Sequence, residues 1–283
     1  MSFDPKGPFD PEGPFDAEAV REFERAGWNR AAAAYEASFA PASRQFIEPL
    51  LDAASVGPED AVLDLCCGPG FVADAAASRR ARASGLDFSP AMLAEAQARF
   101  PALTFTHGDA EAPPFAAASF DAVVSNFGIH HVPRPGLALA GAHRLLRPGG
   151  RIAFSVWAGQ DDNIAWKLIF AAIERYGDNS ASAVPPPGGG FATADDCTSA
   201  LEAAGFARRS ARLLRGVWRL GGAAALVAAF RAGTARMAAM LEAQTPAALT
   251  KIEAALETSV EPYRDGAGIA VPIACIISAG IRP

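Results

Sequence analysis

A glycine-rich loop is the first place in this 283-residue sequence where chemistry is expected. The letters VLDLCCGPGFVA cover residues 62–73, with glycines at Gly68 and Gly70 and a carboxylate at Asp64. Small residues allow a tight turn and let a ligand approach the backbone closely, and a helix that begins there directs its free N–H groups toward the ligand. The loop therefore predicts a nucleotide site without saying which nucleotide it holds.

Two glycine patterns fit the same letters. From Gly68, the letters GPGFVA match the dinucleotide pattern G-x-G-x-x-A, with Ala73 in the third small position. From Asp64, the letters DLCCGPG match a loop that faces a nucleoside with no pyrophosphate. Asp87 offers a carboxylate to the vicinal hydroxyls of a ribose in either case. These residues alone leave NAD and a single nucleoside open.

Two later stretches add polar groups. HGDAEAPPF (107–115) places Asp109 where the exocyclic amine of an adenine needs an acceptor, and NFGIHHVPRP (126–135) contains His130 and His131. Histidine titrates near neutrality and can serve as a general base. A structural hydrogen bond to the loop is the alternative role for each histidine. In an extended segment the two rings would point in opposite directions, and we favour His131 as the one that faces the site.

Alternating strands and helices must position these residues. We expect strands at 61–65, 83–87, 103–107, 120–126 and 150–157, and helices at 70–80, 90–99 and 135–146. Ser89 is predicted to cap the second of these helices, with Pro90 in its first turn. Repeated β-α units of this length predict an α/β protein with a parallel sheet and helices on both faces, in which ligands bind beyond the carboxyl ends of the strands.

The remaining segments are less regular, and we predict a flexible tail at 1–16 followed by a single domain over 17–283. The first helix has Gly27 as a candidate break, and a second helix is expected at 43–54. Residues 161–177 and 193–204 are predicted helices, and 184–191 a loop. The domain would comprise N-terminal helices (17–56), a Rossmann-like core (60–220), a helical insertion (221–260) and a final strand (268–283).

Composition excludes several classes of protein. The net charge is −6 and arginines are scattered, so the clustered cations of a nucleic-acid surface are missing. The four cysteines, Cys66, Cys67, Cys197 and Cys275, lack zinc-site spacing, so no metal is expected. No apolar run has the length of a membrane span and the N-terminus lacks signal-peptide features, so we expect no integral membrane segment and a cytoplasmic location.

Five motifs carry a family resemblance. VLDLCCGPG, GLDFSPAML, GDAEAPPF, FDAVVSNFGIHHV and LRPGGRIAFSVW follow one another over residues 61–157. Together they resemble the class I S-adenosylmethionine-dependent methyltransferases, and most closely the group of the ubiquinone and menaquinone C-methyltransferases. The resemblance implies S-adenosylmethionine as cofactor and a Rossmann-like, doubly wound, mostly parallel seven-stranded sheet with a helical cap. The dinucleotide alternative falls to second place because it leaves the third and fourth motifs unexplained.

The resemblance also implies a role for each matching residue. The methionine part of the cofactor would lie among Asp64, Cys66, Gly68 and Gly70, with backbone from Asn126 and Phe127 for its amino group and Tyr35 for its carboxylate. The ribose would be held by Asp87. The adenine would pack on Phe88 and Met92 and be read at its edge by Asp109 and Ala110.

The acceptor is expected to be a small molecule. Family members that methylate nucleic-acid bases usually follow Asn or Asp with Pro-Pro and an aromatic residue, whereas Asn126 is followed by Phe-Gly-Ile. Apolar helices after residue 221 favour an apolar or aromatic acceptor, with Trp157, Phe191 and Phe230 as wall residues. The methylated atom (carbon, oxygen or nitrogen) and a homodimeric state stay open. So does a second class of function, in which the same fold binds the cofactor and serves as a cyclase or a regulatory subunit.

Overall fold

The computed structural model describes residues 16–179, 191 and 193–283. The predicted tail, apart from its last residue, and most of the predicted loop at 184–191 lie outside these ranges. Contacts divide the chain into two compact units. Unit 1 comprises Met1–Ala42, Gln160–Pro186 and Gly216–Ile273, and unit 2 comprises Ser43–Gly159, Pro187–Arg215 and Ala274–Pro283. The single domain over 17–283 stays a prediction.

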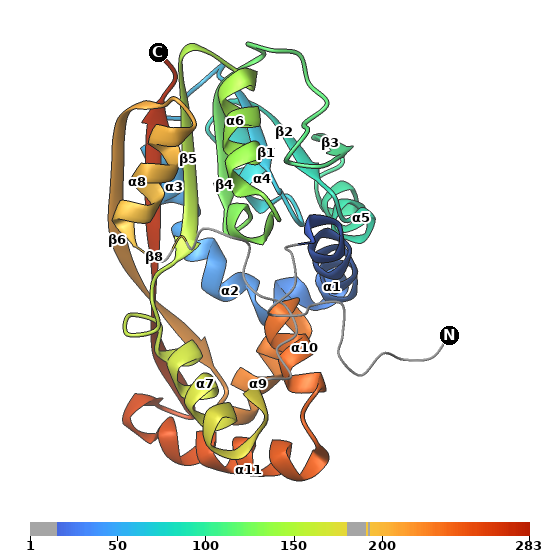
Figure 1. Cartoon of the computed structure of the whole chain (residues 1–283), viewed down its shortest axis with the longest axis vertical. Helices are drawn as coiled ribbons and strands as arrows, with labels where there is room; N and C mark the ends of the chain where they lie inside the picture. Colours follow the sequence, from blue (N-terminus) through green and yellow to red (C-terminus); the bar gives the residue numbers. More distant parts are fainter. Residues whose placement is uncertain (1–15, 180–190, 192) are drawn as a thin grey trace. The chain divides into compact units, whose positions relative to one another are not determined.

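One twisted sheet forms the centre of the fold (Figure 1). Its order is β3-β2-β1-β4-β5-β8-β6, with the two-residue β7 paired to β8. The neighbours from β3 to β5 run parallel, and β8 runs antiparallel to β5. The predicted mostly parallel, doubly wound sheet is confirmed. The strands are β1 (Ala61–Leu65), β2 (Arg82–Asp87), β3 (Thr104–His107), β4 (Phe120–Asn126), β5 (Leu146–Trp157), β6 (Ala207–Leu220), β7 (Arg264–Asp265) and β8 (Gly268–Ile281).

The strand order reverses beside β1, and this position decides where a ligand can bind. From β1 the chain continues outward through β2 and β3 on one side, and then returns to β4 and β5 on the other. In open sheets of this kind, ligands bind beyond the carboxyl ends of the strands at the point of reversal. The loops after β1 and β4 flank that point, and both carry predicted site residues.

The helices of unit 2 precede β1 or lie between later strands in the sequence. They are η1 (Arg44–Phe46), α3 (Ile47–Ala53), α4 (Phe71–Ser78), α5 (Pro90–Arg99), η2 (Ile129–His131), α6 (Pro135–Leu145) and α8 (Ala194–Ala203). The predicted cap of α5 is confirmed, because Ser89 Oγ accepts a hydrogen bond from the Met92 N–H at 3.2 Å. The helix expected at 43–54 is instead a 3-10 turn followed by α3.

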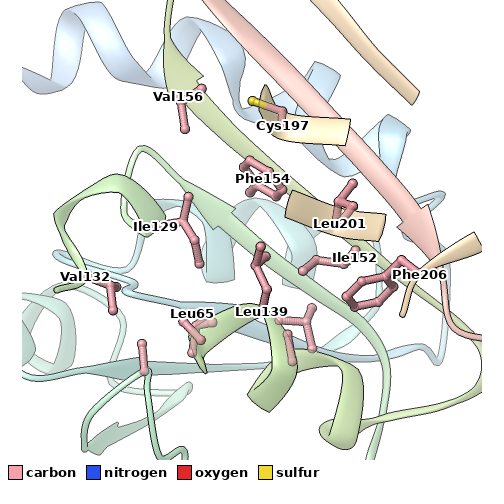
Figure 2. Packing of buried hydrophobic residues seen from close by; sticks show 14 of the residues in the cluster. Leu65, Ile129, Val132, Leu139, Ile152, Phe154, Val156, Cys197, Leu201 and Phe206 are labelled. Atoms are coloured by element: carbon pink, nitrogen blue, oxygen red, sulfur yellow. The ribbon is translucent and has the colours of Figure 1, made fainter. Parts of the chain in front are cut away.

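A hydrophobic cluster fixes α6 and α8 against the sheet of unit 2 (Figure 2). Leu139 of α6 and Leu201 of α8 pack with Ile152 and Phe154 of β5, and all four side chains are buried. Burial of one such side chain stabilises the fold by about 1.5–3 kcal/mol. Ile129 of η2 belongs to the same cluster, so the turn that carries the histidines is anchored in the core.

Unit 1 is built around four aromatic rings. Its helices are α1 (Ala17–Ser38), most of α2 (Ala40–Ser43), α7 (Ile164–Tyr176), α9 (Ala223–Gly233), α10 (Arg236–Glu242), α11 (Pro246–Ser259) and η4 (Glu261–Tyr263). Phe39, Trp166, Trp218 and Phe230 all contact one another, with ring centroids 5.2–6.2 Å apart. Among the described helices none is a membrane-span candidate by itself, although α9 and α10, which meet at a bend of 113°, pass the length and composition test as a pair.

Gly27 was a candidate break in the first helix, but the structure shows no break there. α1 runs without interruption through this position. A Cβ at Gly27 would lie 2.4 Å from Cβ of Ala235, the residue that precedes α10. Glycine is therefore required here because two segments of unit 1 pack closely, and its helix-breaking tendency is overcome by that packing.

Candidate active site

The glycine loop is tied to the end of β2. The Gly68 N–H donates to Oδ2 of Asp87 at 2.8 Å, and the Cys67 N–H donates to the Leu86 carbonyl at 2.9 Å. Gly68 and Gly70 both have positive φ angles, 51° and 82°. A Cβ on Gly70 would also lie 2.7 Å from the Phe105 ring. The loop conformation therefore depends on glycine at both positions, and the Asp87 carboxylate is part of its framework.

Two buried carboxylates face this loop. Asp64 is 1% exposed, and its Oδ2 accepts a hydrogen bond of 3.2 Å from the Ala73 N–H. Its other oxygen, Oδ1, is buried and has no hydrogen-bond partner in the described part of the chain. Burial raises the pKa of Asp64 to about 8, against the lowering effect of the Ala73 hydrogen bond and together with the raising effect of the Asp87 charge. A cationic ligand would supply the missing partner.

Asp87 is more fully satisfied than Asp64. Its two oxygens accept hydrogen bonds of 2.8 Å from the N–H groups of Gly68 and Ser89. Burial nevertheless raises its pKa to about 6, although these hydrogen bonds act in the opposite direction. Each carboxylate oxygen has a second lone pair, so the acceptor capacity needed for ribose hydroxyls is still present.

The two cysteines of the loop are packing residues. Cys66 has a φ of 62°, and its Cβ would lie 2.4 Å from a Cβ placed on Gly128. Cys67 packs beside Gly85, where an added Cβ would lie 2.7 Å from its sulfur. Burial, and then the charges of Asp87 and Asp64, raise the pKa of both thiols well above the ordinary range. Neither thiol is activated as a nucleophile.

The residues predicted for the adenine lie on the loops after β2 and β3. Met92 is 2% exposed, and its sulfur would lie 4.0 Å from a Cβ on Gly68, so it lines the glycine loop. The Phe88 carbonyl is 3.1 Å from Nε2 of His107, which joins the ends of β2 and β3. Asp109 accepts a hydrogen bond from the Glu111 N–H through Oδ1 at 2.8 Å, and Ala110 is buried.

Ser155 of β5 organises the end of β4, a role with no signal in the sequence beyond a small polar residue inside an apolar strand. Its hydroxyl donates to Oδ1 of Asn126 at 2.7 Å and accepts from the Phe127 N–H at 3.0 Å. The Asn126 amide also donates to the Ser43 carbonyl at 3.2 Å. Phe127 has a φ of 57°. These bonds hold the turn after β4 in a conformation that a non-glycine residue rarely adopts.

An aromatic platform follows that turn. The rings of Phe127 and Trp157 are stacked, with centroids 3.9 Å apart and planes 16° apart. Phe46 packs edge-on against both rings. We name Phe46, Phe127 and Trp157 the aromatic platform. Phe46 was missed by the sequence because it lies before the first strand and shares no motif with the other two rings.

His130 and His131 lie in η2, which begins at Ile129 directly after Phe127 and Gly128. We name η2 the histidine turn. The expectation of an extended segment is wrong. The His131 N–H donates to the Gly128 carbonyl at 3.0 Å, and the resulting turn brings the two imidazole rings to 4.3 Å, with their planes tilted by 42°. The two rings are therefore neighbours, not residues on opposite faces.

Three further predicted residues have surroundings of their own. Tyr35 belongs to unit 1, where its ring contacts Trp28 and Phe39. Phe230 also belongs to unit 1 and is fully buried in the four-ring cluster, so a ligand could touch it only after another ring had moved. In unit 2, Phe191 packs against Phe154 at 5.7 Å and adjoins the hydrophobic cluster. Their predicted roles stay predictions.

Known proteins share both the motifs and the fold. Residues 62–150 match the family model described as a methyltransferase domain. The chain is 38% identical over 144 residues to a demethylmenaquinone methyltransferase of Renibacterium salmoninarum, covering 50% of this chain and 61% of the relative. It is 37% identical over 147 residues to a malonyl-[acyl-carrier protein] O-methyltransferase of Pseudescherichia vulneris, covering 51% of this chain and 58% of the relative.

Solved structures extend the likeness in fold to most of the chain. The YcgJ protein of Bacillus subtilis superposes with a TM-score of 0.56 at 17% identity, covering 84% of this chain and 98% of that one. The [4+2]-cyclase SpnF superposes with a TM-score of 0.54 at 17% identity, covering 96% and 97%. At such identities the likeness establishes the fold. The chain spans 61% and 58% of the two curated relatives described above.

The residues around the glycine loop fit S-adenosylmethionine, the cofactor that the family resemblance implies. Asp64 has a buried oxygen without a hydrogen-bond partner in the described part of the chain, and burial raises the pKa values of both Asp64 and Asp87. The cofactor carries a sulfonium and an ammonium group, so it brings the positive charge that this donor set lacks.

Proposed function

We propose that the chain transfers a methyl group from S-adenosylmethionine to a small apolar or aromatic acceptor. The observation that carries this proposal is the glycine loop held by Asp87 beside the partly unsatisfied carboxylate of Asp64. When bound, the cofactor supplies a methyl group on a positively charged sulfur. The work left to the chain is alignment of the acceptor and exclusion of water.

We assign the cofactor contacts to unit 2. Asp87 would accept hydrogen bonds from the ribose hydroxyls, Asp109 and Ala110 would read the adenine edge, and Phe88 and Met92 would pack on the ring. The methionine part would lie among Asp64, Cys66, Gly68 and Gly70, near the backbone of Asn126 and Phe127. Support comes from the motif match over residues 62–150 and from the burial of both carboxylates.

On the acceptor side, we assign His131 as the general base and the aromatic platform as the acceptor wall. A base is needed only where the acceptor must lose a proton, and imidazole suits that task near neutral pH. The stacked Phe127 and Trp157 rings favour a planar or apolar acceptor. His130 lies 4.3 Å away, ring to ring, and is the alternative base. A cytoplasmic location and a homodimer stay predictions.

Calorimetry and product analysis test this proposal. S-adenosylmethionine and S-adenosylhomocysteine should bind, and NAD should not. Candidate acceptors should then be incubated with cofactor carrying a labelled methyl group. Label in the acceptor would support methyl transfer, whereas NAD binding without a response to S-adenosylhomocysteine would reject the cofactor assignment.

A second function is favoured by one comparison. The [4+2]-cyclase SpnF has the same fold over nearly the whole chain. A cyclase of this fold would bind the cofactor and convert an acceptor without consuming the methyl group. An isomerised product with no label, and cofactor recovered unchanged, would favour this function over methyl transfer.

A further inference from the structure

Glu111 joins the loop after β3 to the segment after η2. Its side chain is 3% exposed. Oε1 accepts a hydrogen bond of 2.8 Å from the Arg134 N–H, and Oε2 accepts from Nε and Nη2 of the same arginine at 2.8 and 2.5 Å. A carboxylate that is buried and held at three donors fixes geometry more firmly than an exposed ion pair does. The residue that precedes α6 is thus fastened to the loop after β3.

The same loop is fastened to α6 a second time. Arg144 donates to the carbonyls of Phe115 and Pro113, both at 2.8 Å. A Cβ on Gly141 would lie 3.0 Å from the Pro113 ring, so helix and loop are in close contact. Residues 109–115 and α6 are therefore linked at both ends of the loop, and displacement of one requires displacement of the other.

The two ends of this connection have different predicted tasks. On one side, the Glu111 N–H donates to Oδ1 of Asp109, the residue assigned to the adenine edge. On the other side, Arg134 follows the turn that carries His130 and His131 by three residues. The Glu111 side chain therefore links the loop after β3, which carries Asp109, to the segment that follows the histidine turn.

We propose that Glu111 is a positioning residue that transmits cofactor binding at Asp109 to the histidine turn. Cofactor binding then orders residues 128–134, so the acceptor side is completed after the cofactor has bound. This inference rests on the proposed cofactor contacts of Asp109 but needs no particular acceptor. The alternative is a brace, which stabilises both loops equally with and without cofactor.

Hydrogen exchange separates coupling from bracing. In the unaltered protein, S-adenosylhomocysteine should slow amide exchange over residues 128–134 by about fivefold or more, the lower end of ordinary coupling between sites. Glu111→Gln keeps the shape of the side chain but loses the charge-assisted bonds to Arg134. In this variant the slowing of exchange should fall to less than about twofold. Because coupling is reciprocal, the affinity for S-adenosylhomocysteine should fall by about the same factor as the slowing does.

Arg147→Ala is the matched control. It removes another arginine–carboxylate pair of unit 2, Arg147 with Asp121, whose carboxylate also accepts from the Ala61 N–H at the start of β1. It should leave the cofactor-induced protection of residues 128–134 unchanged. Arg134→Lys provides a second variant if Glu111→Gln fails to fold, since it keeps the positive charge but loses the planar, two-pronged contact. In this variant the cofactor-induced slowing of exchange over residues 128–134 should be smaller than the fivefold or more expected of the unaltered protein.

Three outcomes would overturn the inference. The first is full cofactor-induced protection in Glu111→Gln. The second is faster exchange of residues 128–134 by the same factor with and without cofactor, which identifies a brace. The third is binding of S-adenosylhomocysteine to the unaltered protein with no protection of these residues. Absence of binding would reject the cofactor assignment as well, whereas loss of methyl transfer with protection retained would reject the proposed function alone.

Discussion

The Gly68 N–H and the Asp87 carboxylate are joined by a hydrogen bond of 2.8 Å, so the end of β2 shapes the loop that follows β1. Asp87 also accepts from the Ser89 N–H, at the start of α5. A residue assigned to ribose binding thus has a structural task even without a ligand. Its replacement should affect both cofactor affinity and stability.

Asp87→Ala should weaken S-adenosylhomocysteine binding by at least about tenfold, because each lost charge-assisted bond is worth roughly 1.5–3 kcal/mol. It should also lower the melting temperature of the free protein, since the Gly68 and Ser89 N–H groups lose their acceptor. Calorimetry and thermal unfolding measure the two effects. Asp87→Asn, which keeps one carbonyl oxygen, should be milder in both, and unchanged affinity in Asp87→Ala would show that β2 does not end at the ribose.

The buried carboxylates predict an unusual dependence of stability on pH. Folding raises the pKa of Asp87 from 3.8 to about 6 and that of Asp64 from 3.8 to about 8. At pH values between 3.8 and the raised pKa of each group, the folded chain binds more protons than the unfolded chain. The contribution of both groups to stability is therefore greatest below pH 3.8 and is lost as pH rises toward 8. The slope is at most about 1.4 kcal/mol per pH unit for each proton.

Cofactor binding should reverse part of this effect. A positive charge beside Asp64 lowers its pKa, so S-adenosylmethionine should release protons on binding near pH 7. Calorimetry in buffers with different heats of ionisation measures that release. Asp64→Asn is the control and should remove the proton release. The same release in Asp64→Asn would assign the titration to another group.

His131→Ala should lower turnover by about two to four orders of magnitude if His131 is the base. S-adenosylhomocysteine affinity should change little, and the pH dependence of turnover should lose one limb. His130→Ala is an imperfect control, because the two rings are 4.3 Å apart. His143→Gln on α6, outside the histidine turn, should leave turnover unchanged. Equal and mild effects of His130→Ala and His131→Ala would favour catalysis by positioning alone.

Ser155→Ala should reduce the free energy of unfolding by about 1–3 kcal/mol, because Oδ1 of Asn126 loses the Ser155 hydroxyl and the Phe127 N–H keeps only the Ser155 carbonyl as acceptor. The cofactor affinity should fall as well, since the turn after β4 is released. Urea unfolding and calorimetry test this. Ser125→Ala is a matched control on β4, because the buried Ser125 hydroxyl makes no hydrogen bond to oxygen or nitrogen in the described residues. Equal losses in the two variants would reject the bridging role.

Local patterns predicted most of the strands of the parallel sheet. The strands ending at Leu65 and Asn126 are marked by short apolar runs followed by turn residues, and Ser89 with Pro90 marks the start of α5. Such signals lie within a few residues of the feature they specify. The motif residues of unit 2 were therefore placed correctly on strand ends, although their contacts with a ligand stay predictions.

Contacts between distant residues could not be predicted in the same way. Ser155 lies 29 residues from Asn126, and Glu111 lies 23 residues from Arg134. Neither pair has a periodic or motif signal. Gly27 is the converse case, since its local preference for breaking a helix was overcome by packing against Ala235. The turn conformation of His130 and His131 likewise depends on the Gly128 carbonyl and on burial of Ile129.

The suppressed acidity of the native thiols has a practical consequence for chemical labelling. Cys66 and Cys67 have pKa values well above the usual range, and burial raises those of Cys197 and Cys275 to about 12. Because the thiolate is the reactive form, all four should react slowly with maleimides at neutral pH while the protein is folded. A single cysteine introduced on an exposed surface can then carry a fluorophore or spin label without removal of the native ones.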